Sequence, residues 1–435
     1  MFKHLRKLPA FLFLLLTLSL SGCQAVLDRF PFLQSSPTPE PTVQATSPAV
    51  FEPTSTPEMA ATEPEIISIW LPPQFDPNNN SAAGNLMKAQ MAAFSDAYPE
   101  VKLEVRLKAV QGSGGLMDSL MTASAAAPDV VPGLILLPRA DFEQAALTGL
   151  LLPVEPSEFP LKDEEYFPFA LEMVELKDLR YGLPFSGDLL VFAYNSQQIG
   201  FPPRTLSSLY QQKSITTFPG ADRQGLIPLL SYLNAGGTLE LKDNVLSLQE
   251  KALLSALEWV NNGVNNGLFP FSIAEMTDFD QSFASLQSAQ STYAFTWASR
   301  VLDDSTNKYS FNSLPSDQAT SFTLADGWVL AFPQASTARH EHALNLARLL
   351  TSPVFQQTWS EAAGVVPVSS SILTAWKDKA LSGILLPIAA SARMVPSQFI
   401  LGISGPLLSQ ATQELIRQQV TTIEASNKIL EALKQ

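Results

Sequence analysis

Cysteine is almost absent from this sequence: among 435 residues there is only one, Cys23. A disulfide within the chain is therefore excluded, and the folded part must be stable through the size of its core. A lone thiol in an exported protein would bridge to another molecule or stay reactive, and a buried thiol without a role is the other interpretation. The residues before Cys23 favour a third role.

The segment before Cys23 has the parts of a secretory signal. Lys3, Arg6 and Lys7 form a basic start, and residues 8–20 form an apolar run that is too short to span a bilayer comfortably. Residues 20–23, Leu-Ser-Gly-Cys, resemble the lipobox of bacterial lipoproteins. The resemblance implies cleavage before Cys23, a diacylglycerol on its thiol and further acyl chains such as palmitate. An ordinary signal peptide with an incidental cysteine is the alternative.

The next segment, residues 23–64, is rich in proline, threonine, serine and glutamate and poor in aliphatic side chains. It buries too little apolar surface to offset its ordering entropy, so we predict a disordered linker. With residues 1–22 as the signal peptide, the linker would hold a globular body at the extracytoplasmic face of the bacterial cell membrane. The membrane contact would be the lipid on Cys23.

Positive charge is also scarce: 27 lysines and arginines stand against 41 acidic residues, and the formal net charge is −14. Nucleic-acid binding depends on lysine and arginine that neutralise phosphates, so this balance argues against a nucleic-acid partner. It argues equally against peripheral binding to anionic lipid. Beyond the signal, no uncharged stretch is long enough for a transmembrane helix.

Histidine is scarcer still, and sequence motifs of catalysis are missing. Two of the three histidines, His340 and His342, are two residues apart, which places them on different helix faces and makes a poor metal site. We expect them at a solvated helix N-terminus. No nucleophile elbow, phosphate-binding loop or dinucleotide-binding motif occurs, so we predict a protein that is not an enzyme and needs no cofactor.

The body after the linker alternates short apolar strands with amphipathic helices. Residues 66–70, 101–109 and 128–137 contain strand patterns, and apolar residues recur at helical spacing between 86 and 94. This alternation predicts an α/β fold in which helices cover a mixed, mainly parallel sheet.

Segments of the body resemble, in order, the extracellular solute-binding proteins of ABC importers, in the maltose-binding-protein-like family. The segments that carry the resemblance are YGLPFSGDLLVFAYN at 181–195, ALEWVNNGVNNGLFP at 256–270, YAFTWAS at 293–299 and ADGWVLAFPQAS at 325–336. The resemblance implies a two-lobed periplasmic-binding-protein-like fold (type II) that closes like a hinge on a ligand in the cleft. By analogy, lobe 1 holds residues 65–190 and 328–366, and lobe 2 holds residues 191–327 and 367–435.

The same resemblance implies a monomeric receptor that delivers a small solute, a carbohydrate, to the transmembrane subunits of an ABC permease. A co-receptor that presents its ligand to a sensor kinase is one alternative. A surface hydrolase with a carboxylate pair is another, although the spacing of the acidic residues does not support one.

Flat aromatic faces and charged hydrogen-bonding groups suit a sugar, because rings stack on its C–H face and carboxylates accept from its hydroxyl groups. Seven residues at the segments of the implied cleft meet this description: Trp70, Gln74, Asp188, Trp297, Arg300, Trp328 and Arg393. Core packing is the alternative for Trp70 and Trp328, and a partner role within the hinge strand is the alternative for Asp188. The late segment offers Phe399 without a second aromatic residue, which favours a sugar other than maltodextrin, or a less polar solute.

Overall fold

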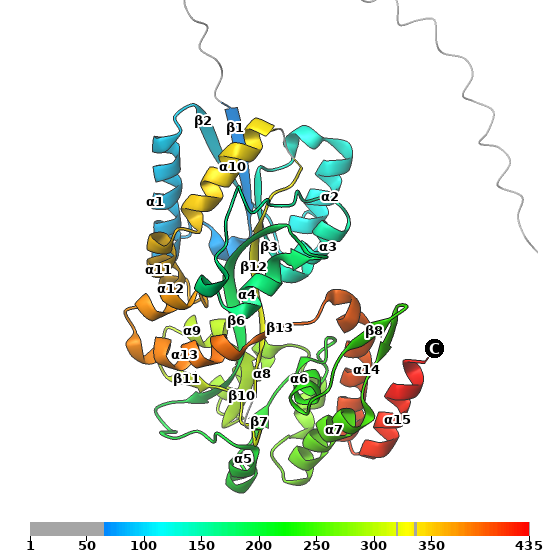
Figure 1. Ribbon diagram of the computed structural model, residues 1–435. Coiled ribbons are helices and arrows are strands. Elements are labelled where there is room, and N and C mark those ends of the chain that lie inside the picture. The colour runs from blue at the N-terminus through cyan, green and yellow to red at the C-terminus, as the bar shows by residue number, and fades with distance from the viewer. Residues whose placement is uncertain (1–64, 319–320, 335–336, 435) are drawn as a thin grey trace, which may run out of the picture. The chain divides into compact units, whose positions relative to one another are not determined.

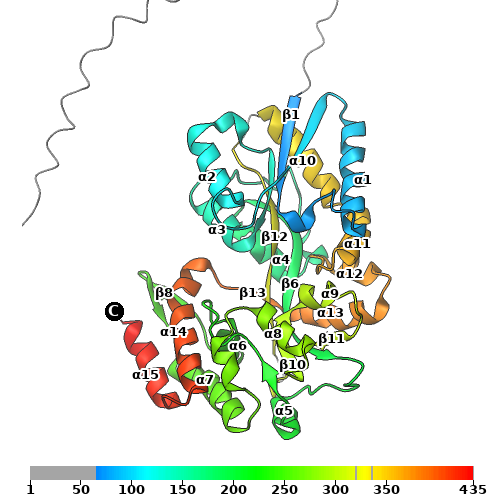
Figure 2. The ribbon, with the colours of Figure 1, turned by 180° about the vertical axis from the view of Figure 1, so that it is seen from behind.

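A nine-stranded sheet runs through the chain in the computed structural model, which describes residues 65–318, 321–334 and 337–434 (Figures 1 and 2). Its main order is β2-β1-β3-β12-β6-β10-β7, with β11 paired to β6 and β13 paired to β12. The predicted signal peptide and linker, residues 1–22 and 23–64 with Cys23, lie outside the described residues. The sheet consists of β1 (Glu65–Leu71), β2 (Val101–Leu107), β3 (Leu134–Pro138), β6 (Gly182–Asn195), β7 (Thr216–Thr217), β10 (Tyr293–Trp297), β11 (Tyr309–Asn312), β12 (Leu324–Ala331) and β13 (Arg393–Met394).

Helices cover this sheet, as the alternating pattern predicts. The α-helices are α1 (Ala82–Ala97), α2 (Leu116–Ala126), α3 (Arg139–Leu147), α4 (Pro168–Val174), α5 (Leu206–Gln212), α6 (Leu226–Asn234), α7 (Glu250–Asn265), α8 (Phe279–Gln287), α9 (Ala298–Leu302), α10 (Thr337–Leu350), α11 (Pro353–Ala362), α12 (Ser370–Ala375), α13 (Lys379–Ser391), α14 (Gln398–Ile416) and α15 (Thr422–Ala432). The 3-10 helices are η2 (Pro73–Phe75), η3 (Pro128–Val130), η4 (Asp163–Glu165) and η5 (Phe271–Glu275), and two hairpins pair β4 (Glu175–Leu176) with β5 (Leu179–Arg180) and β8 (Glu240–Lys242) with β9 (Val245–Ser247). None of the helices in the described ranges is long and apolar enough to cross a membrane.

One end of the sheet carries the N-terminal strands, with α1, α2, α3, α10 and α11 around them (Figure 1). The strand β1 pairs in parallel with both β2 and β3. The helix α1 begins after Ser81, whose hydroxyl accepts from the Gly84 amide, and it buries Met87 and Phe94 at helical spacing. This end forms its own hydrophobic core with Ile67, Phe185 and Trp359 among its buried side chains.

The other end of the sheet is covered by α5 to α8, α14 and α15 (Figures 1 and 2). Its core contains Phe192, Phe218, Leu257 and Phe295, all buried. Here β10 pairs in parallel with β7 and antiparallel with β6.

Two strands run from one end of the sheet to the other, and we call β6 and β12 the crossing strands (Figure 1). β6 is 14 residues long and almost wholly buried, as expected of a strand with both faces covered. It pairs antiparallel with β10, β11 and β12, and β12 also pairs antiparallel with β3. The mixed α/β architecture with two crossing segments is therefore confirmed, with more antiparallel pairing than the strand-helix alternation predicts. The proposed lobe boundaries remain a prediction.

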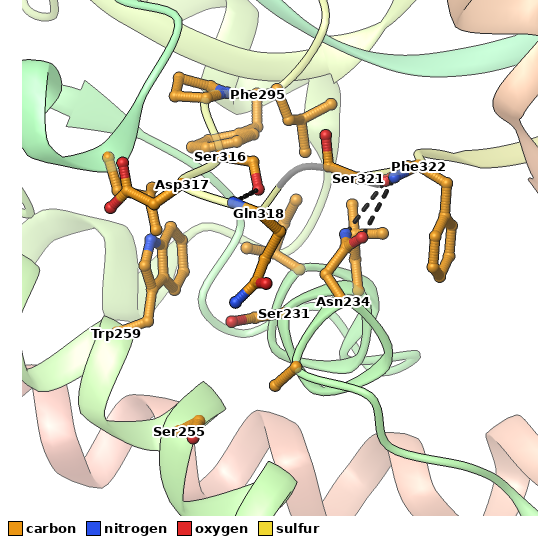
Figure 3. A pocket seen from close by; sticks show the side chains of 16 residues that line it. Ser231, Asn234, Ser255, Trp259, Phe295, Ser316, Asp317, Gln318, Ser321 and Phe322 are labelled. Atoms are coloured by element: carbon orange, nitrogen blue, oxygen red, sulfur yellow. Dashed lines mark hydrogen bonds between the residues drawn. The ribbon is translucent and has the colours of Figure 1, made fainter.

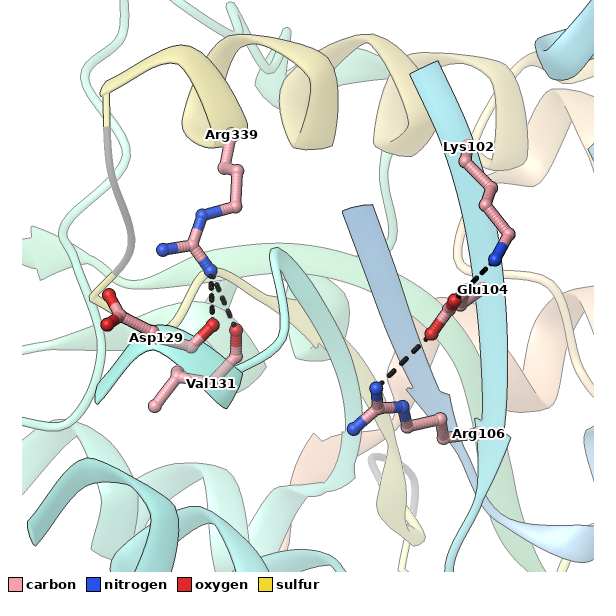
Figure 4. A network of polar contacts seen from close by, with 6 residues as sticks. All are labelled: Lys102, Glu104, Arg106, Asp129, Val131 and Arg339. Atoms are coloured by element: carbon pink, nitrogen blue, oxygen red, sulfur yellow. Dashed lines mark hydrogen bonds and ion pairs between the residues drawn. The ribbon is translucent and has the colours of Figure 1, made fainter. Parts of the chain in front are cut away.

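The edge strand β2 shows how the exposed rim of the sheet is kept polar. Glu104 binds the Lys102 ammonium at 3.0 Å and the Arg106 guanidinium at 3.2 Å (Figure 4). The bond from Lys102, followed by that from Arg106, holds the pKa of Glu104 below its usual value. Charged side chains on an edge strand discourage pairing with another chain.

Helix α10 is tied to the loop before β3 by a side chain near its start. Arg339 donates from Nη1 to the carbonyl oxygens of Asp129 and Val131, at 2.9 Å and 3.5 Å (Figure 4). The contact joins segments more than 200 residues apart in sequence. It fixes the helix that follows β12 against the N-terminal end of the sheet.

His340 and His342 lie near the start of α10, as predicted, but they are less solvated than expected. Their side chains in α10 are only 17% and 19% exposed. The His340 ring lies edge-on to Phe332, and the His342 ring lies edge-on to Tyr98. The physical reason is that α10 packs on both β1 and α1, so its first turn faces protein as well as water.

Candidate functional site

The crossing strands place two carboxylates directly opposite each other. Asp188 of β6 and Asp326 of β12 are register partners in an antiparallel pair, and both side chains are partly exposed. Residues directly opposite in such a pair have Cβ atoms about 4.5–5.5 Å apart and lie on the same face of the sheet. Two like charges at this spacing repel each other, so the site needs neighbours that offset the repulsion.

Asp188 is held by donors from its own strand and from α9. Its Oδ1 accepts from the backbone amides of Leu189 at 2.9 Å and Ser299 at 3.0 Å. Its Oδ2 accepts from the Ser299 hydroxyl. The carboxylate thereby fastens the start of α9 to the crossing strand.

Burial is the main influence on both acids. It raises the pKa of Asp188 to about 6, with the Asp326 charge adding to the increase and the Ser299 hydrogen bonds opposing it. Burial also raises the pKa of Asp326, while its bond from the Gly327 amide and the nearby Arg139 charge lower it. In both acids, burial thus disfavours the charged form of the carboxylate.

A buried ion pair lies beside these carboxylates. Arg139, the first residue of α3, binds Glu143 one turn later, with Nη1 and Oε2 3.0 Å apart and side chains 11% and 8% exposed. The same Glu143 oxygen accepts from the backbone amide of Gln398 at 3.2 Å, at the start of α14. One carboxylate therefore joins a helix at the N-terminal end of the sheet to a helix at the other end.

Two groups of this site still have hydrogen-bonding capacity. Arg139 Nε is buried and has no hydrogen-bond partner. Asp326 uses Oδ1 for the Gly327 amide at 2.8 Å, and its Oδ2 accepts from no other described residue. A donor and an acceptor that both lack partners suit a ligand group that can accept and donate, as a hydroxyl does. We call Asp188, Asp326, Arg139, Glu143 and Ser299 the crossing-strand site.

Three of the residues predicted from sequence lie near this site. Trp297 is the register partner of Leu190, two residues from Asp188, and it caps α9 while its ring lies edge-on to Phe279 at 5.6 Å. Arg300 follows in α9, but its guanidinium turns to Asp280, 2.5 Å away and exposed. Trp328 is two residues from Asp326 and half-buried.

The Trp328 ring packs edge-on to Phe75 at 5.2 Å. Its position on β12 brings it close to the crossing-strand site, although this contact belongs to the core. Arg393 is exposed and lies over the Phe322 ring, with Cζ 3.8 Å from the ring centroid.

The remaining two predicted residues lie at the end of β1. Trp70 is 3% exposed and part of a core cluster, with Lys108 Nζ 4.6 Å from its ring centroid. Gln74 lies in η2 and is exposed. No described contact joins either of them to the crossing-strand site.

Sequence reasoning missed Asp326, Arg139, Glu143 and Ser299 as members of one site. The sequence could have indicated Asp326 as a site residue, because it lies in the second crossing segment just as Asp188 lies in the first. No sequence pattern indicates the other three as site residues. For Arg139 and Glu143, an ion pair one turn apart at the start of a helix is usually a surface feature.

Comparison with known proteins agrees with this architecture. The family model described as bacterial extracellular solute-binding protein matches residues 89–382. No curated protein matches the sequence.

Among solved structures, the GacH receptor of Streptomyces glaucescens, studied without ligand and with acarbose, matches with a TM-score of 0.65 at 15% identity, over 85% of this chain and 97% of that one. A cyclo/maltodextrin-binding protein complexed with maltotetraose matches with a TM-score of 0.69 at 16% identity, over 86% and 98%. An ABC transporter solute-binding protein from Thermotoga lettingae, bound with α-D-tagatose, matches with a TM-score of 0.65 at 20% identity, over 85% and 100%. These likenesses show a shared fold, and the family match covers more than half of the sequence. The chain belongs to the family of bacterial extracellular solute-binding proteins.

Proposed function

We propose that this protein is a sugar-binding receptor that delivers its ligand to an ABC import permease. The observation that carries the proposal is that Asp326 Oδ2 on the crossing strand β12 and Arg139 Nε on the adjoining helix α3 have no hydrogen-bond partner among the described residues. Sugar hydroxyl groups both donate and accept, so each needs such a pair when it leaves water. Glu143 holds the Arg139 guanidinium at 3.0 Å, and Asp188 accepts from the backbone amide of Ser299.

The bound states of proteins with the same fold support a carbohydrate ligand. The similar structures include proteins with acarbose, maltotetraose and α-D-tagatose. The aromatic platform that a sugar ring needs is Trp297, because it directly precedes the helix that Asp188 holds. Bringing the two ends of the sheet together around the crossing strands would enclose the ligand.

The sugar hypothesis is tested by melting curves and calorimetric titration with maltotetraose, acarbose and α-D-tagatose. A ligand at ten times its dissociation constant raises the free energy of unfolding by about 1.4 kcal/mol.

Replacing Trp297 by alanine should weaken binding of the sugar that binds at least tenfold, because the stacking surface is lost.

The matched control is Phe271→Ala, which removes an aromatic side chain that is 60% exposed and lies in η5. It should leave sugar affinity unchanged. If none of the three sugars shifts the melting curve, the carbohydrate ligand is wrong. If a sugar binds equally well to the Trp297 variant, the platform is wrongly placed.

The receptor would be anchored through Cys23, which is the basis of the next prediction. A thioether-linked lipid with two or more chains gives stable attachment to a membrane. Cys23→Ala should therefore abolish incorporation of labelled fatty acid and release the protein from the membrane fraction. A Cys23→Ser variant serves as the closest isostere and should behave the same way. Membrane retention of both variants would contradict the lipid anchor and favour an ordinary signal peptide.

A further inference from the structure

A cavity lies away from the crossing-strand site, between α6, α7, β10 and the segment at residues 314–318 (Figure 3). We call it the α6–α7 pocket. Its volume is about 240 Å³. This is slightly below the usual range of pockets for drug-sized molecules, so it suits a molecule of about one ring. None of the five residues of the crossing-strand site lines it.

The floor of the pocket is apolar and buried. Ile227, Leu230 and Phe295 line it and are 3%, 2% and 3% exposed. The half-buried Trp259 ring forms a wall at right angles to the Phe295 ring, with centroids 6.1 Å apart and an interplanar angle of 83°. Such a corner offers one ring a stacked contact and an edge contact at once.

The polar side chains that line the pocket differ in whether they already form hydrogen bonds within the protein. Asn234 is bonded to the backbone of Phe322: its amide nitrogen donates to the Phe322 carbonyl at 3.0 Å, and its oxygen accepts from the Phe322 amide at 3.1 Å (Figure 3). Asp317 accepts from the amide and hydroxyl of Ser207 at 3.4 Å and 3.2 Å.

Two of the lining side chains that remain free to bind a ligand are Ser231 and Gln318. The Ser231 hydroxyl and the Gln318 side-chain amide form no hydrogen bond with any other described residue, and Gln318 extends toward the side of the pocket that Ser231 forms (Figure 3). Together they can accept from and donate to one polar edge of a bound molecule.

Charge narrows the class of ligand further. None of the described lining residues is lysine, arginine or histidine, and Asp317 contributes a carboxylate. An anion would therefore enter without a counter-charge, which is costly. A sugar carries hydroxyl groups around its whole ring, and those facing Ile227, Leu230 and Phe295 would lose their partners at about 1–3 kcal/mol each.

We propose that the α6–α7 pocket is a second ligand site, for a small uncharged flat-ring compound with a single polar edge, such as a phenol. The ring packs on Trp259 and Phe295, and the polar edge faces Ser231 and Gln318. The site is separate from the proposed sugar site and does not depend on it.

The test uses 4-fluorophenol as the probe and fluorine NMR on the full chain as the readout. We expect saturable broadening and shift of the probe signal as protein is added. The anionic analogue 4-fluorobenzoate, matched in ring and fluorine, should bind at least tenfold more weakly because the pocket has no cation. Saturating the protein with a sugar identified by calorimetry should not displace the probe.

Two variants locate the binding. Ser231→Phe fills the pocket and should weaken probe binding at least tenfold, whereas Ser95→Phe, at an exposed position of α1, should leave it unchanged. If Ser231→Phe lowers the melting temperature, Gln318→Ala decides, because that side chain is exposed and holds no other group. It should weaken binding several-fold without a change in melting.

Three outcomes would overturn the proposal. The first is no saturable binding of 4-fluorophenol. The second is equal binding of the phenol and the benzoate. The third is wild-type affinity in the correctly folded Ser231 and Gln318 variants, which would place the probe elsewhere. Since sugar binding is measured separately, each of these results leaves the proposed receptor function standing.

Discussion

Replacing Glu143 by alanine is expected to lower the free energy of unfolding by about 3–5 kcal/mol, the usual cost of removing one member of a buried ion pair. The change leaves the Arg139 guanidinium buried, where its Nε already has no partner. It also removes the acceptor of the Gln398 amide at the start of α14. Urea unfolding followed by circular dichroism measures the loss.

The control for this prediction is Glu165→Ala, which breaks an exposed ion pair with Lys162. The Lys162 side chain is 66% exposed and the Glu165 side chain is 52% exposed. That variant should lose less than about 1 kcal/mol. Replacing Arg139 by methionine together with Glu143 by leucine should recover much of the stability, because no buried charge is left unpaired. A Glu143 variant as stable as the Glu165 variant would show that the pair is well solvated.

The crossing segments are indicated by resemblance to the solute-binding family, which residues 181–195 and 325–336 carry. Strands β6 and β12 occupy these segments. Helix α1 follows from the spacing of Met87, Met91 and Phe94, which the structure buries. Local patterns of this kind depend only on neighbours in the sequence, so they can be read without knowing the fold.

The members of the crossing-strand site could not be assembled in the same way. Asp188 is indicated by its place in the segment that resembles the solute-binding family, and by the cost of burying an acid alone in an apolar run. Its register partner Asp326 depends on a pairing between strands more than 130 residues apart, and a shift of one residue would have turned that side chain to the other face. The bond from Gln398 to Glu143 spans 255 residues. Only the folded chain shows these contacts.

The α6–α7 pocket was invisible from sequence for a related reason. Trp259 belongs to the segment at 256–270 that carries the family resemblance, and its ring is half-buried in α7. A cavity beside it arises from the path of residues 314–318, which no local pattern describes. Packing defects and pockets are properties of how elements meet, and periodicity within one element carries no information about them.

The stability of the wild-type protein is expected to fall relative to that of an Asp188→Asn variant as the pH rises from 4 to 7. Burial raises the pKa of Asp188 to about 6, whereas an aspartate in an unfolded chain titrates near 3.9. Between these two values the native state binds more protons than the unfolded state, so the free energy of unfolding decreases with increasing pH. The contribution of this group is complete below about pH 4 and is lost as the pH passes through 6. The native and unfolded pKa of this carboxyl differ by about 2, which corresponds to about 3 kcal/mol in the free energy of unfolding.

Asparagine removes the titration while keeping most of the hydrogen bonds. Its oxygen can accept from the amides of Leu189 and Ser299, and the Ser299 hydroxyl can turn to accept from the new amide group. Urea unfolding at several pH values should therefore give wild-type and variant curves that diverge by about 3 kcal/mol between pH 4 and pH 7. Asp326→Asn should reduce the slope as well, because the Asp326 charge contributes to the raised pKa of Asp188. Parallel curves for the wild type and the Asp188 variant over this range would mean that solvent reaches the carboxylate freely, and that the two acids on the crossing strands titrate as exposed groups do.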